Sequence, residues 1–355
     1  MNFEVRRDDL RTTRIVDAKA PDLDDGQVSL RVSRFALTAN NVTYAVFGDA
    51  MSYWRFFPTE EGWGRVPVWG FAEVEASRSA ALREGERIYG YLPMATHLVV
   101  TPGRAAPGHF VDISPGRASL PGTYNQYQRI DNLSTHDAAR ERERAVLGPL
   151  FTTAFLIDDW LDEQQTFGAT SILLGGASSK TALGVAFLLA ASRRAEVIGL
   201  TSPANADFVR SVGYFDRVST YDEIGNLPAR PTAFIDMAGG GRILARVHHH
   251  FGDALVASCL VGATHWEESA PPARLPGPAP AFFFAPDRLQ KRRADWGSGG
   301  FESRIDSTWR AFLASVDGWL VFDERRGPAA IADAWLEVVD ARLPPRVGLL
   351  LYPRV

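Results

Sequence analysis

The most regular pattern in the chain lies between residue 170 and about residue 262, where short apolar runs alternate with turns of small residues and helix-like segments. Short apolar runs bounded by turn residues are typical of buried strands. Strands that alternate with helices predict a parallel sheet with right-handed crossovers. The runs that we expect to be strands are residues 171–174, 196–200, 232–236 and 254–258.

The beginning of the chain shows a different pattern of polar and apolar residues. Residues 27–35 alternate roughly in polarity, and residues 87–92 and 97–100 are compact β-like runs. Glycine and proline punctuate these runs, so we predict a small β-rich domain. Residues 102–132 are rich in glycine, proline and serine and show little periodicity, which predicts a winding connection at the edge of that domain.

The remaining segments are mostly helical in pattern. A charged stretch at residues 138–144 precedes an apolar helix-like segment at 151–161, and we expect a domain boundary near here. Beyond a proline-rich loop at 271–280, the pattern predicts a helix at 305–316 and a final strand at 347–351. A chain of 355 residues exceeds the size at which one hydrophobic core stops growing, so two domains are expected.

Composition and charge exclude several classes of function. The formal net charge is −4 and the basic residues are spread along the chain, which argues against a nucleic-acid surface. The only cysteine, Cys259, excludes internal disulfides and any zinc site with more than one thiolate, and it is expected to pack as a small hydrophobe. No apolar run approaches about 18 residues and the N-terminus is charged, so we expect a cytoplasmic protein without membrane insertion.

A run of three histidines, residues 248–250, invites a metal assignment. Consecutive residues on a helix point in different directions, so these side chains cannot all bind one ion. We expect them to lie at the surface.

The candidate chemistry lies in the turn after the first strand of the predicted α/β domain. There an apolar strand runs into small residues and then into an apolar helix. Such a turn directs backbone N–H groups and the positive end of a helix dipole at one spot, which suits a phosphate or pyrophosphate. The residues predicted to bind it are Gly176, Ala177, Ser178, Ser179, Lys180 and Thr181.

Two other interpretations of this turn stay open. A strict G-x-G-x-x-G pattern is absent, because serine, lysine and alanine stand where glycines are expected. The end of the turn resembles the P-loop of a nucleotide triphosphatase, but that motif needs glycine in place of Leu174 and Ser179. The turn could also be an ordinary strand-to-helix connection without a ligand. The strand–helix–strand order around it favours the dinucleotide.

The end of the second predicted strand bears on which dinucleotide binds. An acidic residue there hydrogen-bonds the ribose hydroxyls and favours NAD. This chain has Thr201 and Ser202 instead, with Lys180 and Arg210 as charge partners for a 2′-phosphate. NADP(H) is therefore the predicted cofactor.

Several short motifs together resemble the medium-chain dehydrogenase/reductase superfamily, in particular its zinc-free quinone-oxidoreductase and enoyl-reductase branch. Residues 176–182 stand where that family has a Gly-Ala-Ser-Gly-Gly-Val-Gly turn, and residues 235–240 are similar to its Val-Asp-x-x-Gly-Gly segment. Residues 39–44 occupy the place of Gly-Ile-Asn-Pro-x-Asp, and residues 85–90 are close to Gly-Asp-Arg-Val-x-Gly. The lysine in the turn and the many aromatic residues of the first domain depart from the family pattern.

The resemblance implies an α/β fold with a Rossmann doubly wound parallel sheet at residues 136–304. It also implies a β-rich GroES-like domain at residues 1–135, completed by about residues 305–355. The activity implied is NADPH-dependent reduction of an activated alkene or a quinone, a small-molecule substrate, by hydride transfer without a metal. Homodimers are ordinary in this family. The alternative is a non-catalytic NADPH-binding regulatory protein, because no indispensable catalytic side chain is visible.

The resemblance also implies the positions of further site residues. A donor to the developing enolate oxygen is expected in such a reductase. The candidate catalytic residues are Asn41, Tyr44 and Tyr53. Additional cofactor contacts are expected at Thr152, Ala238, Gly239, Val261 and Gly262. The candidates for the substrate pocket are Trp54, His265 and Phe284.

Overall fold

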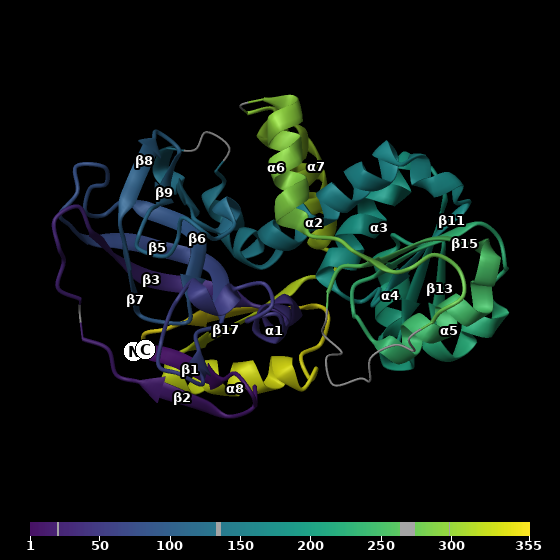
Figure 1. Cartoon of the computed structure of the whole chain (residues 1–355), viewed down its shortest axis with the longest axis horizontal. Coiled ribbons are helices and arrows are strands. Elements are labelled where there is room, and N and C mark those ends of the chain that lie inside the picture. The colour runs from purple at the N-terminus through teal and green to yellow at the C-terminus, as the bar shows by residue number, and fades with distance from the viewer. Residues whose placement is uncertain (20, 133–135, 263–273, 298) are drawn as a thin grey trace. The chain divides into compact units, whose positions relative to one another are not determined.

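The computed structural model describes residues 1–19, 21–132, 136–262, 274–297 and 299–355 (Figure 1). The candidate His265 lies outside these residues. The described chain divides into two compact units. The first unit is Met1–Val146 with Val321–Val355, and the second unit is Leu147–Leu320.

The second unit is built on a parallel sheet, as the apolar runs predict. In the described part of the chain, six strands form this sheet in the order β13-β12-β11-β14-β15-β16, and every pairing is parallel. This is the strand order of a Rossmann fold, so the predicted fold class is confirmed. The strands are β11 (Ser171–Gly175), β12 (Glu196–Thr201), β13 (Arg217–Thr220), β14 (Thr232–Asp236), β15 (Leu255–Leu260) and β16 (Ala281–Phe282).

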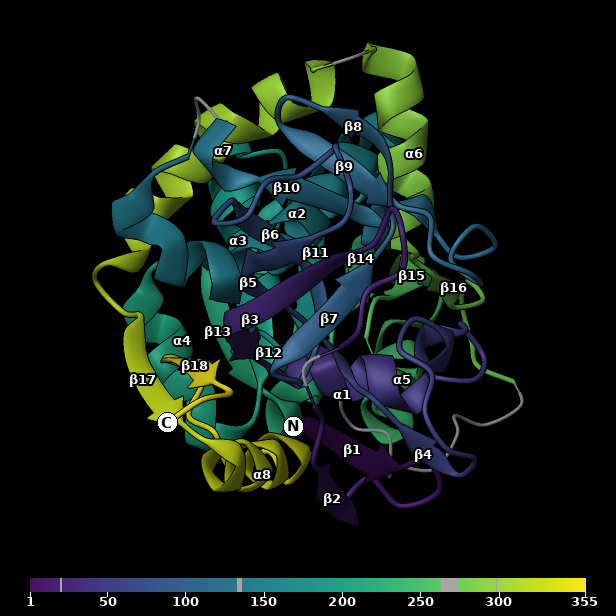
Figure 2. The same cartoon turned by 90° about the vertical axis from the view of Figure 1, so that its left-hand side faces the viewer.

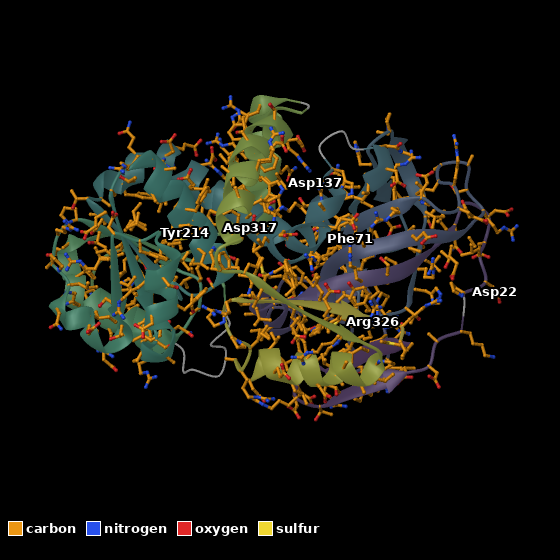
Figure 3. All side chains as sticks on the ribbon, turned by 180° about the vertical axis from the view of Figure 1, so that it is seen from behind. Asp22, Phe71, Asp137, Tyr214, Asp317 and Arg326 are labelled. Carbon is orange, nitrogen blue, oxygen red and sulfur yellow. The ribbon has the colours of Figure 1, made fainter. Side chains whose placement is uncertain are left out.

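Helices surround this sheet (Figure 1). Apolar residues of α5 and of the strands form one buried cluster, which includes Leu173, Phe234 and Val247. The segment after α7 is tied to the segment after α4, because Trp319 Nε1 donates a hydrogen bond to Tyr214 Oη at 3.1 Å (Figure 3 labels Tyr214). The helices of the second unit are α3 (Lys180–Ser192), α4 (Ala206–Val212), α5 (Gly241–Phe251), α6 (Ala285–Trp296) and α7 (Gly300–Val316).

The two helical patterns predicted around residues 138–161 belong to α2 (Glu141–Glu163), which follows a 3-10 turn at Ala138–Arg140. The division between the units falls within this helix. Pro149 lies inside α2 and has no N–H to donate. The helix nevertheless continues, and the Thr153 hydroxyl donates to the Pro149 carbonyl at 3.1 Å.

The first unit is rich in β-strands (Figure 2 looks onto them). Among the described residues, a small sheet has the order β2-β1-β4, and a larger one has the order β17-β18-β3-β5-β6-β10-β9-β8, with β7 also paired to β3. The small sheet contains β1 (Asn2–Arg6), β2 (Thr13–Val16) and β4 (Trp63–Gly64). The larger sheet contains β3 (Val28–Leu37), β5 (Pro67–Ser77), β6 (Arg87–Pro93), β7 (His97–Val100), β8 (Pro102–Ala106), β9 (His109–Asp112), β10 (Gln126–Arg129), β17 (Val321–Arg326) and β18 (Val347–Tyr352).

The prediction for residues 102–132 was wrong, because this segment supplies β8, β9 and β10 to the larger sheet. The strands are short, and their glycine and proline content hid their polarity pattern. Their stability comes from tertiary packing. The Tyr127 ring stacks on Phe110 at 5.1 Å between centroids, and it occupies the space that a side chain on Gly90 would need.

The C-terminal segment packs on the first strands of the chain. β18 pairs antiparallel with β3, with Leu350 opposite Ala36. The helix α8 (Pro328–Val339) buries Trp335 completely, and the indole N–H of this residue donates to the Leu10 carbonyl at 2.7 Å. These long-range contacts place residues 321–355 in the first unit.

No helix within the described residues combines the length and the hydrophobicity needed to cross a membrane.

Candidate functional site

The predicted phosphate turn connects β11 to α3 in the second unit. Gly176 has a φ of +65°, a left-handed conformation that glycine adopts without strain. Ser179 is the N-cap of α3, and its side chain accepts a hydrogen bond from the Ala182 N–H at 3.2 Å. The start of a helix has N–H groups without intrahelical acceptors and carries partial positive charge. The turn therefore has the local geometry of an anion site, with the Ser179 oxygen already used as a helix cap.

This turn lies where the strand order of the sheet reverses. β11 pairs with β12 on one side and with β14 on the other, so Gly175 lies between Leu200 and Asp236. Ligands of such sheets bind at the carboxyl ends of the strands at this switch point. A Cβ on Gly176 would lie only 3.3 Å from the Cβ of Ala238. The two turns therefore pack closely, and the glycine at position 176 allows this approach.

Hydrogen bonds tie the turn to both neighbouring strands. The Ala177 N–H donates to the Leu200 carbonyl at 3.0 Å, and the Met237 N–H donates to the Gly175 carbonyl at 3.2 Å. The Asp236 carboxylate, which is buried, accepts from the Ala238 N–H at 2.9 Å. The turn is thus held in place by the sheet.

Lys180 is the first residue of α3 and is partly buried. Burial lowers the pKa of its ammonium group to about 8. Burial and the helix dipole both oppose the positive charge of an ammonium group at a helix start, and a bound phosphate would offset both effects. This position therefore suits a phosphate group as partner.

The end of β12 carries hydroxyl groups and an amide. Thr201 is buried, and Ser202 caps a 3-10 turn at Pro203–Asn205. The Asn205 side-chain amide donates to the Ser178 hydroxyl at 3.2 Å and so links this loop to the phosphate turn. Sequence reasoning missed Asn205. Its place at the N-cap of α4, where asparagine is favoured, was the available signal.

Arg210 lies on α4 and is half exposed. Its guanidinium forms an ion pair with Asp207 at 2.8 Å, and the Asp207 side chain is fully exposed. An exposed pair of this kind contributes little to stability and can be exchanged for a better anion. The Arg210 guanidinium can therefore leave Asp207 and pair with a phosphate that binds near the end of β12.

The remaining cofactor candidates of the second unit fall into two groups. The first group follows two strands of the sheet: Ala238 and Gly239 come after β14, and Val261 and Gly262 come after β15. The Val261 N–H donates to the Asp236 carbonyl at 2.8 Å. Thr152 lies on α2, where its hydroxyl donates to the Gly148 carbonyl at 2.9 Å. Phe284, a substrate-pocket candidate, is the N-cap of α6 and is partly exposed.

In the first unit, the candidate Asn41 lies on α1 (Ala39–Val46) and is buried. Its side-chain oxygen accepts from the Thr38 N–H at 2.7 Å, and its amide donates to the Pro67 carbonyl at 2.8 Å. Both ends of the side chain thus hold α1 in place. This arrangement favours a structural role for Asn41.

Tyr44 and Tyr53, the other catalytic candidates, lie side by side in a buried aromatic cluster with Tyr91 and Tyr124. The rings of Tyr44 and Tyr53 are 4.8 Å apart between centroids. The Tyr53 and Tyr124 hydroxyl oxygens are 3.3 Å apart, and Trp69 Nε1 donates to Tyr44 Oη at 3.3 Å. Sequence reasoning did not include Tyr124 or Trp69 among the site residues. Nothing in their local pattern pointed to this contact.

Burial raises the pKa of each of these phenols above its ordinary value, and the shift is largest for Tyr91 and Tyr124. The phenols are therefore protonated at neutral pH. A protonated phenol can donate a hydrogen bond or a proton to an oxygen that gains negative charge.

Trp54, predicted to line the substrate pocket, is buried in the first unit. Its ring fills the space beside Gly48 and Gly64, where any Cβ would lie within 2.5 Å of the indole. This position favours a packing role for Trp54.

The expectation that all three histidines of α5 lie at the surface was wrong for His248. This residue is fully buried, and its ring nitrogens lie 2.8 Å from the Pro276 carbonyl and 2.8 Å from the Ser258 hydroxyl. A carbonyl can only accept, so Nδ1 carries the proton and Nε2 accepts from Ser258. Because α5 is amphipathic, residue 248 lies on its buried face.

Cys259 is buried in β15, which confirms that it packs as a small hydrophobe, and burial raises the pKa of its thiol to about 12. In the part of the chain that the structure describes, no three His, Cys, Asp or Glu side chains gather in a way that could hold a metal ion.

Comparison with solved structures finds proteins that share this fold over nearly the whole chain. CurA from Vibrio vulnificus superposes with a TM-score of 0.63 and 13% identity, over 97% of this chain and 94% of that chain. The yhdH oxidoreductase from Salmonella enterica, solved with NADP, gives 0.55 and 15% over 97% and 96%. The quinone oxidoreductase from Thermus thermophilus, whose complex with NADPH is solved, gives 0.57 and 15% over 99% of each chain.

The chain therefore shares its fold with these solved structures, as the resemblance predicted. A family model described as "Protein of unknown function (DUF2855)" matches residues 35–344, and the chain belongs to this family. A sequence comparison with the curated proteins gave no match.

Proposed function

We propose that this chain is an NADPH-dependent oxidoreductase. The observation that carries the proposal is the turn at the switch point, where the left-handed Gly176 leads from β11 to the N-terminus of α3. This geometry fits the pyrophosphate of a dinucleotide, which needs close approach to the backbone at a helix start. Solved structures with the same fold include complexes with NADPH or NADP.

The choice of NADPH over NADH rests on the end of β12. No acidic residue occupies positions 201–205, so a 2′-phosphate meets no repulsion there. We propose that Lys180 neutralises phosphate charge at the turn, and that Ser202, Asn205 and Arg210 contact the adenosine end.

The proposed substrate is an activated alkene or a quinone. When bound, NADPH supplies the hydride. The chain's own part is to orient the substrate and to donate a proton or hydrogen bond to the oxygen that gains charge, and Tyr44 or Tyr53 is suited to this because burial keeps the phenol protonated. With a single cysteine in the chain, we propose that the reaction proceeds without zinc.

The proposal is tested by titrating NADPH, NADH and ATP into the wild type and into Lys180→Ala, Arg210→Ala and Lys291→Ala, with fluorescence and thermal shift as readouts. We expect Lys180→Ala to weaken NADPH binding about tenfold or more, since hydrogen bonds to charged groups contribute about 1.5–3 kcal/mol. Arg210→Ala should weaken NADPH binding a few-fold and leave NADH unchanged. Lys291→Ala is the control, because that exposed lysine pairs with Glu163 and Asp295 on a different part of the unit.

The outcomes separate the alternatives. Absence of binding to any dinucleotide would overturn the proposal. Tight NADPH binding without turnover of enones or quinones would favour the regulatory protein. Stabilisation by ATP and Mg²⁺ alone would favour a triphosphatase.

A further inference from the structure

A side-chain hydrogen bond joins the loop after β12 to the phosphate turn after β11. Asn205 Nδ2 donates to the Ser178 hydroxyl oxygen at 3.2 Å, although the two residues are 27 positions apart in the sequence. They meet because β11 and β12 pair in parallel and end at the same edge of the sheet. The bond therefore connects the segment proposed to bind the pyrophosphate with the segment proposed to contact the adenosine end.

The backbone of Asn205 is fixed by the turn in which it lies. Pro203, whose ring restricts φ, begins the 3-10 turn Pro203–Asn205. The Asn205 N–H donates to the Ser202 carbonyl at 3.1 Å. The next residue, Ala206, is buried and begins α4. The side-chain amide of Asn205 thus extends toward Ser178 from a backbone that is held on both sides.

The backbone around Ser178 is held in the same way. Before it, the Ala177 N–H donates to the Leu200 carbonyl at 3.0 Å. After it, the Ser179 N–H donates to the Gly176 carbonyl at 2.8 Å. These bonds fix the position of residue 178 but leave the direction of its hydroxyl proton to side-chain contacts.

The direction of the bond from Asn205 determines the part that the Ser178 hydroxyl can play. An amide N–H only donates, so the Ser178 oxygen is the acceptor. A hydroxyl has one proton and two lone pairs, so this bond leaves the Ser178 proton for another acceptor. An anion at the start of α3 needs hydrogen-bond donors, and a hydroxyl in this state supplies one.

We propose that Asn205 is a positioning residue of the cofactor site, which acts on the pyrophosphate by holding the Ser178 hydroxyl as a hydrogen-bond donor. This inference rests on the proposed NADPH-binding function. It gives Asn205 a role beyond contact with the adenosine end, because its effect reaches a ligand that has no adenosine. Inorganic pyrophosphate is such a ligand, and it separates the two roles.

The test is a double-mutant cycle in the full-length protein with Asn205→Ala, Ser178→Ala and the double variant. The affinity for inorganic pyrophosphate is read from its displacement of NADPH, followed by NADPH fluorescence. We expect Asn205→Ala to weaken pyrophosphate binding about fivefold when Ser178 is present, and to have no effect in the Ser178→Ala background. Unchanged pyrophosphate affinity in Asn205→Ala, or an equal loss in both backgrounds, would overturn the positioning role.

The matched control is Ser192→Ala. This serine lies at the other end of α3, where its hydroxyl donates to the Leu189 carbonyl at 3.0 Å, and it is exposed. We expect Ser192→Ala to bind pyrophosphate and NADPH like the wild type. A loss equal to that of Ser178→Ala would show that the effect comes from a change in α3 as a whole, and would count against the proposal.

Asn205→Asp keeps the shape of the side chain and removes its N–H donor. The Ser178 hydroxyl would then donate to the carboxylate and be lost to the ligand. We expect pyrophosphate binding at least as weak as in Asn205→Ala, with thermal unfolding of the free protein close to that of the wild type. An Asn205→Asp protein that binds pyrophosphate like the wild type would contradict the proposal.

The two levels of the argument fail in different ways. If the wild type binds no NADPH, the proposed function is wrong and the role of Asn205 fails with it. If the wild type binds NADPH and pyrophosphate displaces it equally well from the wild type and from Asn205→Ala, the proposed function stands and only the positioning role is wrong.

Discussion

The phosphate turn of the second unit and the tyrosine cluster of the first unit carry the candidate chemistry in opposite ways. The turn is made of small residues within one short segment, and a side chain at Gly175 or Gly176 would crowd its neighbours. The cluster uses large buried rings from four separate segments. We infer that changes in the turn act mainly on ligand binding, whereas changes in the cluster act mainly on stability.

The largest expected effect concerns the cluster. Tyr91→Ala should lower the free energy of unfolding by about 3–5 kcal/mol, the range for deleting a buried aromatic ring. The ring is fully buried and stacks on Tyr124. Urea unfolding followed by tryptophan fluorescence measures this loss, and Tyr91→Phe is the matched control. If Tyr91→Ala is as stable as Tyr91→Phe, the inference that changes in the tyrosine cluster act mainly on stability is wrong.

The next effect concerns the turn. Gly176→Val should weaken NADPH binding about a hundredfold, because the branched side chain would crowd Ala238 and displace the turn at which the pyrophosphate is proposed to bind. The left-handed backbone adds a stability cost of about 1–2 kcal/mol. Isothermal titration with NADPH measures the affinity. Gly225→Ala is the control, since nothing lies within 4 Å of a Cβ there. Affinity equal to the wild type in Gly176→Val would show that the ligand binds elsewhere.

The smallest expected effect concerns the charge of Lys180 in the phosphate turn. Burial lowers the pKa of Lys180 to about 8, so its ammonium form is lost as the pH rises through 8. Only the charged form attracts phosphate, so NADPH affinity should fall about tenfold between pH 7 and pH 9. Lys180→Arg, which stays charged, should show almost no pH dependence, and Lys180→Met should be weak at every pH. A wild-type affinity that is flat over this range would exclude Lys180 as a phosphate partner.

How much of the site the sequence revealed depends on whether a feature is local. The strand–turn–helix around Gly176 and the absence of an acid after β12 are properties of consecutive residues, and both were predicted. The Asn205 link to Ser178 was missed, because it joins two loops that meet only when β11 and β12 pair. Asn41 was predicted to be catalytic from its place in a motif, yet its side chain is engaged in hydrogen bonds that the motif does not reveal.

The sequence by itself determined the Rossmann sheet, the small-residue turn and the expectation of NADPH, because apolar periodicity and turn chemistry act over a few neighbouring residues. Only the tertiary structure decided that residues 102–132 supply three strands, that His248 is buried, and that the Tyr53 and Tyr124 hydroxyl oxygens lie 3.3 Å apart. The reason is physical. A short strand rich in glycine and proline gains its stability from the partners it pairs with, and a side chain acquires its hydrogen bonds and its pKa from residues far away in the chain.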